Sequence, residues 1–272
     1  MEKQFIALID FSENSPGLLR QVETWCNHTG ASLLLLHQAD FVVPSRLEDR
    51  VREQVILQHQ NEVEAEMRKL ALETLQPTTK FVCITTQLNL ADKLVKVMDE
   101  PHDYTIFAGL KGTGILKRLF VGSMVLNVVE KVDATLVALP TQADFMLPKR
   151  VQVAIGNKYP VNATALNNFL ELLGDRVELL RFFHIATKDE PQARVLAHMK
   201  SLEKLFKDRF STQVMLCEHD SPIDKMKDVV TAGGDDILVV QRGPRNLSDQ
   251  LFRKFLTNEL VYDGHVPLVV LP

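Results

Sequence analysis

The chain has few cysteines, no long hydrophobic run and no excess of basic residues. Its three cysteines, Cys26, Cys83 and Cys217, are far apart and form no CxxC pair, which argues against a disulfide-stabilised secreted domain and a cysteine-built zinc site. Asp10 directly follows a short apolar run, so the beginning of the sequence lacks the long apolar region of a signal peptide. The longest apolar stretches, such as Leu33–Leu36, are far too short to span a bilayer. We therefore expect a protein of the reducing cytoplasm with no membrane partner.

The overall charge excludes one broad class of partner. Lys and Arg number 31 against 35 Asp and Glu, which gives a net charge of −4. Without a basic excess the chain is a poor candidate for binding the backbone of a nucleic acid. A single phosphorylated small molecule remains compatible with this balance, because it needs only local donors. The hydrophobic fraction of 46% over 272 residues is enough for the cores of one large or two ordinary domains.

The sequence contains two similar halves. The matching segments are Ala7–Asp10 with Val153–Gly156, Leu33–His37 with Leu180–His184, and Thr135–Pro140 with Pro267–Pro272. The offset between matching residues falls from 146 at the start to 132 at the end, so the second copy is shorter. These matches predict a first domain at 1–140, a linker at 141–148 and a second domain at 149–272.

Strand and helix patterns alternate in both halves. The expected strands are Phe5–Ile9, Leu33–His37, Lys80–Thr85, Tyr104–Ala108 and Thr135–Leu139, then Val151–Ile155, Glu178–His184, Gln213–Cys217, Ile237–Gln241 and Leu268–Leu271. The expected helices are Ser15 to about Asn27, Arg46–Thr74, Leu90–Asp99 and Ser123–Lys131, then Asn162–Leu173, Pro191–Phe210, Ile223–Ala232 and Leu247–Tyr262. Ser15-Pro16 is a good amino-terminal cap and first-turn pair for the first helix, which should end near Gly30. The long helix is amphipathic, and its apolar stripe is Val51, Val55, Ile56, Val63, Met67, Leu70 and Leu75. The strands are apolar on both sides, as in a parallel sheet covered on both faces. The pattern therefore predicts two α/β domains, each with a doubly wound, five-stranded parallel sheet.

A glycine-rich loop follows the fourth expected strand. It runs Gly109-Leu-Lys-Gly112-Thr-Gly114, and Gly122-Ser123 then opens a helix. Glycines let the backbone approach a phosphate, and a helix amino terminus adds N–H donors. Ser123 can cap this helix and also donate to a phosphate. Glycine count alone favours ordinary tight turns, whereas the position between a strand and a helix favours phosphate binding. The loop is neither a Walker A motif nor, after a fourth strand, a dinucleotide fingerprint.

This spacing resembles the nucleotide-binding pattern of the universal stress protein family. The pattern is Gly109-x2-Gly112-x9-Gly122-Ser123, and the segments Ile9–Glu13 and Leu35–His37 resemble the ends of the family's first two strands. The resemblance covers the whole chain as a tandem of two such domains, with the nucleotide motif intact in the first one only. It implies an adenine nucleotide alpha hydrolase-like fold.

The resemblance also implies a ligand and the residues that bind it. The ligand would be ATP, alone or with Mg²⁺, or another adenine nucleotide. Asp10 would contact the ribose or the adenine edge, and the Gln38 backbone would face the adenine. Ala108 and Gly109 would pack beneath the ribose, and Gly112, Gly122, Ser123, Met124 and Val125 would hold the phosphates. From the residues alone, Asp10 could equally cap the following loop or helix through Ser12 or Ser15.

The second half departs from the pattern at each position of the motif. Gly156-Asn157 stands where Asp10 stood, Gln241–Arg245 replaces the glycine loop, and Phe255-Leu256-Thr257 replaces Gly-Ser. Because Pro244 removes an amide donor and bulky side chains keep a ligand away from the backbone, we expect this site to be degenerate. Arg242 and Arg245 are most simply surface charges, with anion binding as the alternative.

The histidines give no metal-ligand spacing. His37 and His184 occupy matching strand ends, which indicates a packing or hydrogen-bonding feature of the fold. The other histidines considered are His102, His198, His219 and His265. We therefore predict no metal ligands among the side chains.

These observations favour a binding protein with a regulatory or stress-response role. The residues beside Gly109–Ser123 include no obvious general base, and no SGGxDS-type loop follows the first strand, so we name no catalytic residue. The alternatives are a slow ATPase or nucleotidyl-transfer enzyme and a ligand-free structural or dimerisation protein. The final strands, which end at Pro140 and Pro272, suggest a pseudo-dimer of the two halves within the chain, and the chains themselves could form homodimers.

Overall fold

The chain forms two compact units of alternating strands and helices. The computed structural model describes residues 2–39, 48–110, 127–140, 147–186, 191–219, 236–243 and 267–272. The first unit is Met1–Gly109 and the second is Leu110–Pro272. Each unit is considered by itself below.

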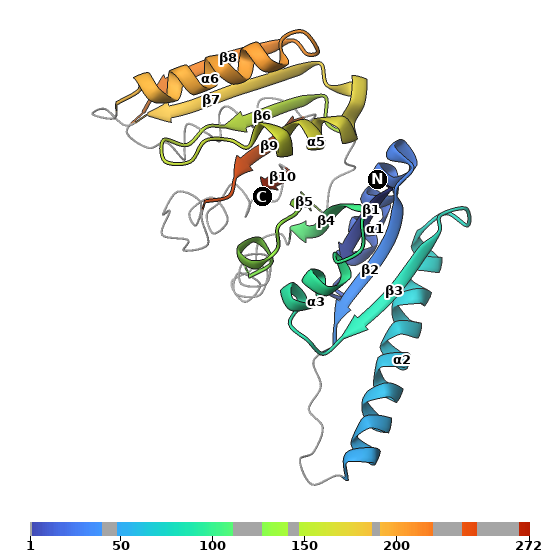
Figure 1. Cartoon of the computed structure of the whole chain (residues 1–272). Helices are drawn as coiled ribbons and strands as arrows, with labels where there is room; N and C mark the ends of the chain where they lie inside the picture. Colours follow the sequence, from blue (N-terminus) through green and yellow to red (C-terminus); the bar gives the residue numbers. More distant parts are fainter. Residues whose placement is uncertain are drawn as a thin grey trace. The chain divides into compact units, whose positions relative to one another are not determined.

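The first unit is a parallel sheet with helices on both faces (Figure 1). Its strands are β1 (Lys3–Leu8), β2 (Ser32–Gln38), β3 (Phe81–Thr86) and β4 (Asp103–Leu110), in the order β3-β2-β1-β4. Its helices are α1 (Ser15–Thr29), α2 (Asp49–Thr74) and α3 (Leu90–Val97). All three pairs of neighbouring strands are parallel. This arrangement aligns the carboxyl ends of the strands along one edge.

Aromatic packing joins α1 to the centre of this sheet. The rings of Phe5 and Phe107 lie 5.0 Å apart, and Trp25 of α1 lies 5.6 Å from Phe107. All three side chains are completely buried. Edge-on aromatic pairs of this kind add about 0.5–1.5 kcal/mol beyond the burial of their area. The contact therefore fixes α1, and with it the turn that follows β1.

The ends of α1 agree in part with the sequence prediction. Gly30 ends the helix in the left-handed conformation (φ +72°), and its N–H donates to the Cys26 carbonyl at 2.8 Å. Ser15, expected as the amino-terminal cap, is instead the first helical residue, and Asn14 is the cap. The reason is that the Ser15 hydroxyl donates to Asp10 at 3.0 Å. The side chain thus joins α1 to the end of β1.

The apolar stripe predicted along α2 is buried over its second half only. Met67 and Ala71 are the buried residues of this helix, whereas Val51 and Val55 are 40% and 39% exposed. The prediction that Val51 and Val55 face the core is therefore wrong. The physical reason is length: 26 helical residues extend about 39 Å, whereas the six residues of β3 extend about 20 Å. Figure 1 shows the first turns of α2 continuing past the end of β3.

The described residues of the second unit form six strands. They are β5 (Thr135–Pro140), β6 (Arg150–Ala154), β7 (Leu179–Ala186), β8 (Thr212–Glu218), β9 (Asp236–Gln241) and β10 (Leu268–Leu271), in the order β5-β10-β9-β6-β7-β8. Its described helices are α5 (Ala163–Leu173), the short 3₁₀ helix η1 (Gly174–Arg176) and α6 (Ala193–Phe206), and residues 127–131 are also helical. The strands β10, β9, β6, β7 and β8 are parallel along this order, whereas β5 is antiparallel to β10.

The strand expected as the fifth of the first half is β5, which belongs to the second compact unit. Val137 of β5 lies opposite Val269 of β10, and this pairing gives β5 its partner within that unit. The domain boundary predicted at residue 140 stays a prediction. The helices predicted at 223–232 and 247–262 lie outside the described residues, as do residues 123–126 of the helix predicted at 123–131.

A buried carboxylate lies at the amino-terminal edge of the second sheet. Asp236 is 4% exposed and accepts from Arg150 Nε at 2.8 Å and from Gln152 Nε2 at 3.4 Å. Burial raises the pKa of Asp236, while its bonds to Gln152 and Arg150 act in the opposite direction. A buried carboxylate needs such partners, so Arg150 supports the folded second unit.

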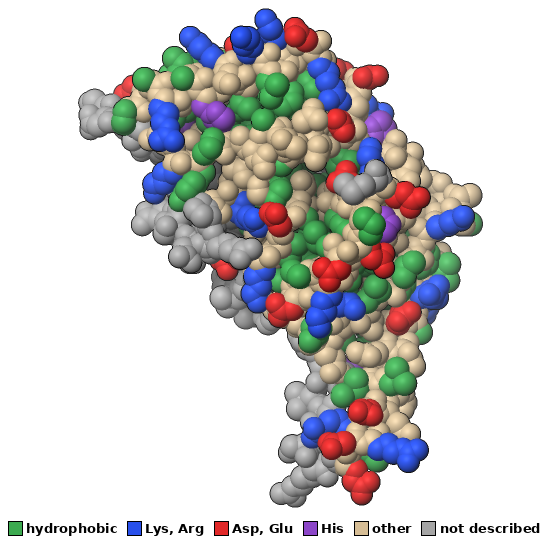
Figure 2. Space-filling model, in the orientation of Figure 1, with side chains coloured by type: hydrophobic (Ala, Val, Ile, Leu, Met, Phe, Trp, Pro, Cys, Tyr) green, Lys and Arg blue, Asp and Glu red, His purple; other side chains and the backbone are tan. Residues whose placement is uncertain are grey.

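The prediction of an α/β fold built on largely parallel sheets is confirmed. Among the described residues, no helix combines the length and the apolar character needed to cross a membrane. Figure 2 shows acidic and basic side chains interspersed over the visible face.

Two substitutions in α2 test how far this helix is supported. We expect Met67→Ala to lower the free energy of unfolding by about 3 kcal/mol, because Met67 is fully buried. Val55→Ala should change it by less than about 0.5 kcal/mol, because Val55 is exposed and lies outside the core. Urea unfolding of both variants measures the difference. Equal losses would show that the first half of α2 has a packing partner.

Candidate functional site

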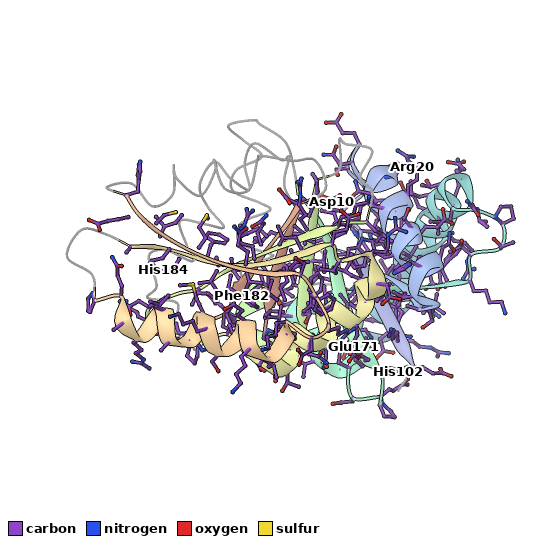
Figure 3. All side chains as sticks on the ribbon, turned by 90° about the horizontal axis from the view of Figure 1, so that it is seen from above. Asp10, Arg20, His102, Glu171, Phe182 and His184 are labelled. Carbon is purple, nitrogen blue, oxygen red and sulfur yellow. The ribbon has the colours of Figure 1, made fainter. Side chains whose placement is uncertain are left out.

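The carboxyl-terminal edge of the first sheet brings four of the predicted site residues together. Asp10 follows β1, Gln38 ends β2, and Ala108 and Gly109 lie at the end of β4. The strand order places β1 between β2 and β4, and parallel strands share one carboxyl edge, where ligands bind in open α/β sheets. Figure 3 labels Asp10 and also His102, which precedes β4 at the opposite edge. The five predicted phosphate-binding residues, Gly112, Gly122, Ser123, Met124 and Val125, lie outside the described residues.

Asp10 organises the turn between β1 and α1. Its Oδ1 accepts from the backbone N–H of Ser12 and from the hydroxyl of Ser15, both at 3.0 Å. These bonds confirm the alternative interpretation of the sequence, in which Asp10 caps the following loop and helix through Ser12 and Ser15. Asp10 is nevertheless exposed.

The residue after Asp10 has a strained backbone. Phe11 has φ +53°, the only positive φ at a non-glycine position among the described residues. An L-residue pays about 1–2 kcal/mol for this conformation. The Phe11 ring packs edge-on against His37, with centroids 4.6 Å apart. Strained residues that persist next to a strand end are common at binding sites.

His37 ties the ends of β1 and β2 together. Its Nδ1–H donates to the carbonyl of Ile9 at 2.8 Å, one residue beyond the end of β1. In the second unit the Nδ1–H of His184 donates to the carbonyl of Ile155 at 2.7 Å. The prediction that the two histidines share a hydrogen-bonding role is therefore confirmed. A ring held in this way keeps one tautomer and one orientation.

The side chain of Gln38 supports the beginning of α3. Its Oε1 accepts from the backbone N–H of Leu90 at 3.1 Å. The next residue of the helix, Ala91, donates to Asn89 Oδ1 at 3.0 Å. The sequence predicts that the Gln38 backbone faces an adenine. Because the bond to Leu90 uses only the side chain, it is compatible with that predicted role.

Gly109, the penultimate residue of β4, has no side chain. Ala108 is buried and Gly109 is half-buried. The 132-residue spacing that relates Pro140 to Pro272 also relates Gly109 to Gln241. The two units can therefore be compared at the same strand end.

In the second unit, side chains lie over the corresponding strand end. Gln241 Oε1 accepts from the backbone N–H of Asn162 at 2.8 Å, and its Nε2 donates to the carbonyl of Pro272 at 2.7 Å. The Tyr159 ring is so close to Gly243 that an added Cβ would lie 3.0 Å from Tyr159 Cε2. Sequence reasoning named Gln241 only as part of a replaced loop and did not single out Tyr159. The two hydrogen bonds of Gln241 and the contact between the Tyr159 ring and Gly243 supply a physical reason why the second half would lack a nucleotide site.

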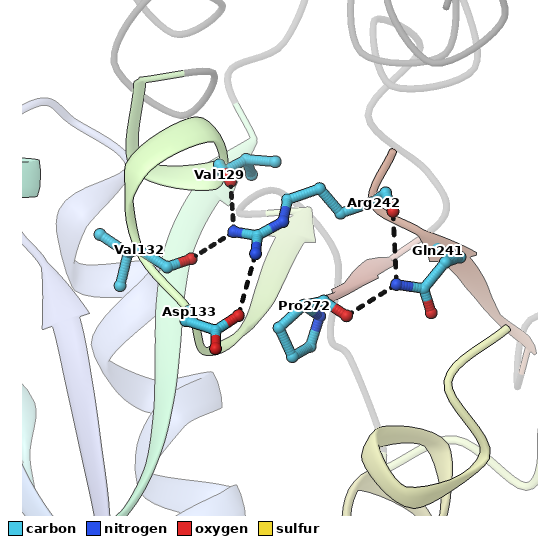
Figure 4. Close-up of polar contacts among 6 residues, drawn as sticks. All are labelled: Val129, Val132, Asp133, Gln241, Arg242 and Pro272. Atoms are coloured by element: carbon cyan, nitrogen blue, oxygen red, sulfur yellow. Dashed lines mark hydrogen bonds and ion pairs between the residues drawn. The ribbon is translucent and has the colours of Figure 1, made fainter. Parts of the chain in front are cut away.

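Arg242 is not the surface charge that the sequence suggested. Its side chain is 15% exposed and donates to Asp133 at 2.9 Å and to the carbonyls of Val129 and Val132 (Figure 4). The surface-charge interpretation is therefore wrong for this residue. Nothing in the sequence marks two carbonyls more than 100 positions away as its partners. Arg245 lies outside the described residues.

The described histidines beyond the strand ends have structural contacts. The Val161 N–H donates to His198 Nε2 at 3.0 Å, and burial lowers the pKa of His198, so a neutral ring acts as the acceptor. His102 lies 3.3 Å from the Tyr104 hydroxyl. The part of the chain that the structure describes contains no grouping of three or more His, Cys, Asp or Glu side chains suited to a metal ion.

Comparison with solved structures identifies the fold. A universal stress protein from Archaeoglobus fulgidus DSM 4304 matches with a TM-score of 0.66 and 16% identity, over 100% of this chain and 99% of that chain. A candidate universal stress protein from Pseudomonas aeruginosa UCBPP-PA14 matches with a TM-score of 0.54 and 9% identity, over 99% of this chain and 93% of that chain.

A third similar structure has a different setting. It is the cytoplasmic domain of a prokaryotic cation chloride cotransporter, with a TM-score of 0.56 and 12% identity, over 99% of this chain and 95% of that chain. Neither a protein-family model nor a curated protein sequence matches this chain. The chain therefore has the fold seen in universal stress proteins.

Two substitutions at Asp10 test its part in the turn. We expect Asp10→Ala to lower the free energy of unfolding by about 1 kcal/mol, because Ser12 and Ser15 lose their acceptor. Asp10→Asn keeps an acceptor oxygen and should lose less than about half of that amount. Urea unfolding provides the measurement. An Asn variant as unstable as the Ala variant would mean that the negative charge, rather than the acceptor, stabilises the turn.

Proposed function

We propose that this chain is a tandem universal stress protein whose first half binds an adenine nucleotide. ATP is the expected ligand, alone or with Mg²⁺, and the expected role is cytoplasmic regulation or stress response. The single observation that carries the proposal is the contrast between Gly109 and Gln241. Gly109 has no side chain and leads into the glycine motif, whereas Gln241 at the matching position carries a hydrogen-bonded side chain.

The described residues of the first half fit an adenosine group. The exposed Asp10 carboxylate is a suitable acceptor for ribose hydroxyls, and its bonds to Ser12 and Ser15 hold it in place before a ligand arrives. Gly109 permits a close approach of a ribose to the backbone of β4, above the buried Ala108. The Gln38 backbone is the proposed neighbour of the adenine. Bound Mg²⁺ would supply charge neutralisation of the phosphates.

The phosphate part of the proposal rests on the sequence motif. Backbone amides at Gly112 and Gly122, the Ser123 hydroxyl and the amides of Met124 and Val125 are the proposed donors. Their spacing after Gly109 matches that of the universal stress protein family. No general base is assigned, so the proposed function is binding rather than turnover.

The second half acts as a structural partner in this proposal. Its Gln241 and Tyr159 side chains lie where a nucleotide would need open backbone, so it keeps the fold without the site. A bound nucleotide in the first half would act by shifting the population of a partner-binding state. The cotransporter domain, which has a similar fold, is itself the cytoplasmic domain of a larger protein. We also propose that chains associate as homodimers.

ATP titration by calorimetry tests the proposed site. We expect the purified wild-type chain to bind ATP and Gly109→Gln to bind it at least tenfold more weakly. The fold should accept this change, because the second unit carries Gln241 at the matching position. Gly122→Val and Asp10→Ala should also weaken binding, the first by removing backbone approach and the second by removing the ribose acceptor.

Gly156→Ala provides the matched control. Gly156 stands at the position of Asp10 in the second half, and an added Cβ would meet only the Tyr159 carbonyl, at 4.0 Å. Its ATP affinity should equal that of the wild type. Unchanged binding in Gly109→Gln, Gly122→Val and Asp10→Ala together would contradict the site, and a wild type that binds no nucleotide would contradict the function.

A further inference from the structure

Four of the eight large apolar side chains that are exposed among the described residues belong to one helix, α2. They are Val51, Val55, Leu57 and Leu72, and Leu72 is 67% exposed. The helix lies beside β3, the edge strand of the first unit (Figure 1). Exposed apolar residues that gather on one element indicate an interaction surface, whereas scattered ones are normal. The solvent side of α2 is therefore a candidate for such a surface.

Three of these four side chains lie on one line along the helix. From Val51, alternating steps of four and three residues reach seven exposed residues, which we call the outer seam: Val51, Val55, Gln58, Glu62, Ala65, Lys69 and Leu72. This spacing is that of the contact seam of a coiled coil. The buried Met67 lies two residues from both Ala65 and Lys69, which places it about 160° around the helix from each of them. The outer seam therefore faces away from the sheet.

The charges of the outer seam fit a second copy of the same helix in the antiparallel direction. In a parallel pair, Glu62 would lie opposite Glu62 and Lys69 opposite Lys69, and such like charges repel. An antiparallel pair with Val55 opposite Leu72 of the second copy places Glu62 opposite Ala65. Glu62 then also lies one helical turn from Lys69 of the second copy, so opposite charges approach. The seam is thus complementary to itself when one copy is reversed.

The polar residues of the outer seam are bonded only weakly within α2. Gln58 Nε2 donates to Glu62 Oε1 at 2.9 Å, and Lys69 Nζ lies 3.9 Å from Glu73 Oε1. Both pairs join exposed side chains four residues apart, and pairs of this kind contribute little to stability. Contacts to a second copy can replace them with little loss of free energy.

We propose that two copies of this chain associate through the outer seam of α2, with the two helices antiparallel. Val55 of each copy packs against Leu72 of the other, which gives two apolar layers on either side of a centre formed by Ala65 and Glu62. The inference rests on the part of the proposed function in which the chains form homodimers, and it assigns that association to α2 instead of the strands that end at Pro140 and Pro272. Because the centre of the seam is polar, the dimer is reversible and depends on concentration.

Sedimentation equilibrium of seam variants tests the surface. We expect the wild-type chain to dimerise as its concentration rises, and Val55→Glu and Leu72→Glu each to raise the dissociation constant at least tenfold, because each places a carboxylate in an apolar layer. Leu57→Glu is the matched control, since Leu57 is exposed on the same helix but lies off the seam. Its dissociation constant should stay within twofold of the wild type, and circular dichroism should show all three variants to be folded.

A charge exchange tests the direction of the pair. Glu62→Lys brings a second positive charge next to Lys69 of the other copy, so it should weaken the dimer about fivefold. Glu62→Lys combined with Lys69→Glu brings opposite charges together again and should restore the dissociation constant to within twofold of the wild type. A structural effect of Glu62→Lys on one helix alone would not be reversed in this way.

Cysteine cross-linking tests which residues meet. The background is Cys217→Ser, because Cys26 and Cys83 are buried. Val55→Cys combined with Leu72→Cys should give a covalent dimer on oxidation. The two positions are 72 − 55 = 17 residues apart on one helix, or about 25 Å, too far for a disulfide within one chain. Val55→Cys alone should give no cross-link, because the two copies of residue 55 are equally distant in the antiparallel pair.

The outcomes separate this surface from homodimer formation in general. A wild-type chain that stays monomeric at every concentration would overturn both, and would leave the seam to a different protein. A dimer that Val55→Glu and Leu72→Glu leave intact would overturn the role of α2 while homodimer formation stands. Cross-linking by Val55→Cys alone would overturn the antiparallel arrangement. ATP titration measures the nucleotide part of the proposed function independently of these results.

Discussion

The parallel direction of neighbouring strands is the constraint on which the rest of this structure depends. It brings all the carboxyl ends of a sheet to one edge, where the ladder stops and carbonyl groups must find other partners. The chain meets this need twice in the same way, with His37 donating to Ile9 and His184 donating to Ile155. The imidazole bond extends the connection between two strands by one residue. It also fixes where the loop after the first strand of each unit begins.

The two units differ in what lies beyond that shared bond. In the first, Asp10 arranges the loop by accepting from Ser12 and Ser15, and the penultimate residue of β4 is Gly109. In the second, Gln241 spans from Asn162 to Pro272. A glutamine with both ends of its amide bonded is costly to displace, because a ligand would have to replace each of these bonds. At matching strand ends the scaffold thus has Gly109 in one unit and a bonded polar side chain in the other.

The sequence was informative where the physics is local. Apolar strands with turn residues between them predicted the parallel α/β architecture, and Gly30 predicted the end of α1, because both depend on a few adjacent residues. Periodicity correctly indicated one face of α2 but could not show that β3 is too short to cover Val51 and Val55. Arg242 was misjudged for a similar reason. Its partners are the backbone carbonyls of Val129 and Val132. Every residue has a backbone carbonyl, so residue types do not indicate which ones it contacts.

Of the candidate site, the sequence predicted the positions at the sheet edge and the capping bonds of Asp10 to Ser12 and Ser15, but not the side-chain contacts at the second strand end. The residue types of Gln241 and Tyr159 do not indicate their positions. The structure shows these positions through the hydrogen bonds of Gln241 and the contact of the Tyr159 ring with Gly243. A motif records which residues a ligand needs. It does not record the side-chain contacts by which a related copy differs.

The antiparallel pairing of β5 with β10 has a consequence for folding kinetics. Val137 pairs with Val269, which lies 132 residues further along the chain. This contact forms only after a long loop has closed, so the entropy of loop closure is lost before the strands gain any hydrogen bond. β5 is apolar, with four of its residues from Leu136 to Leu139 almost fully buried in the final state. Until β10 arrives, that strand presents an unprotected edge to other chains.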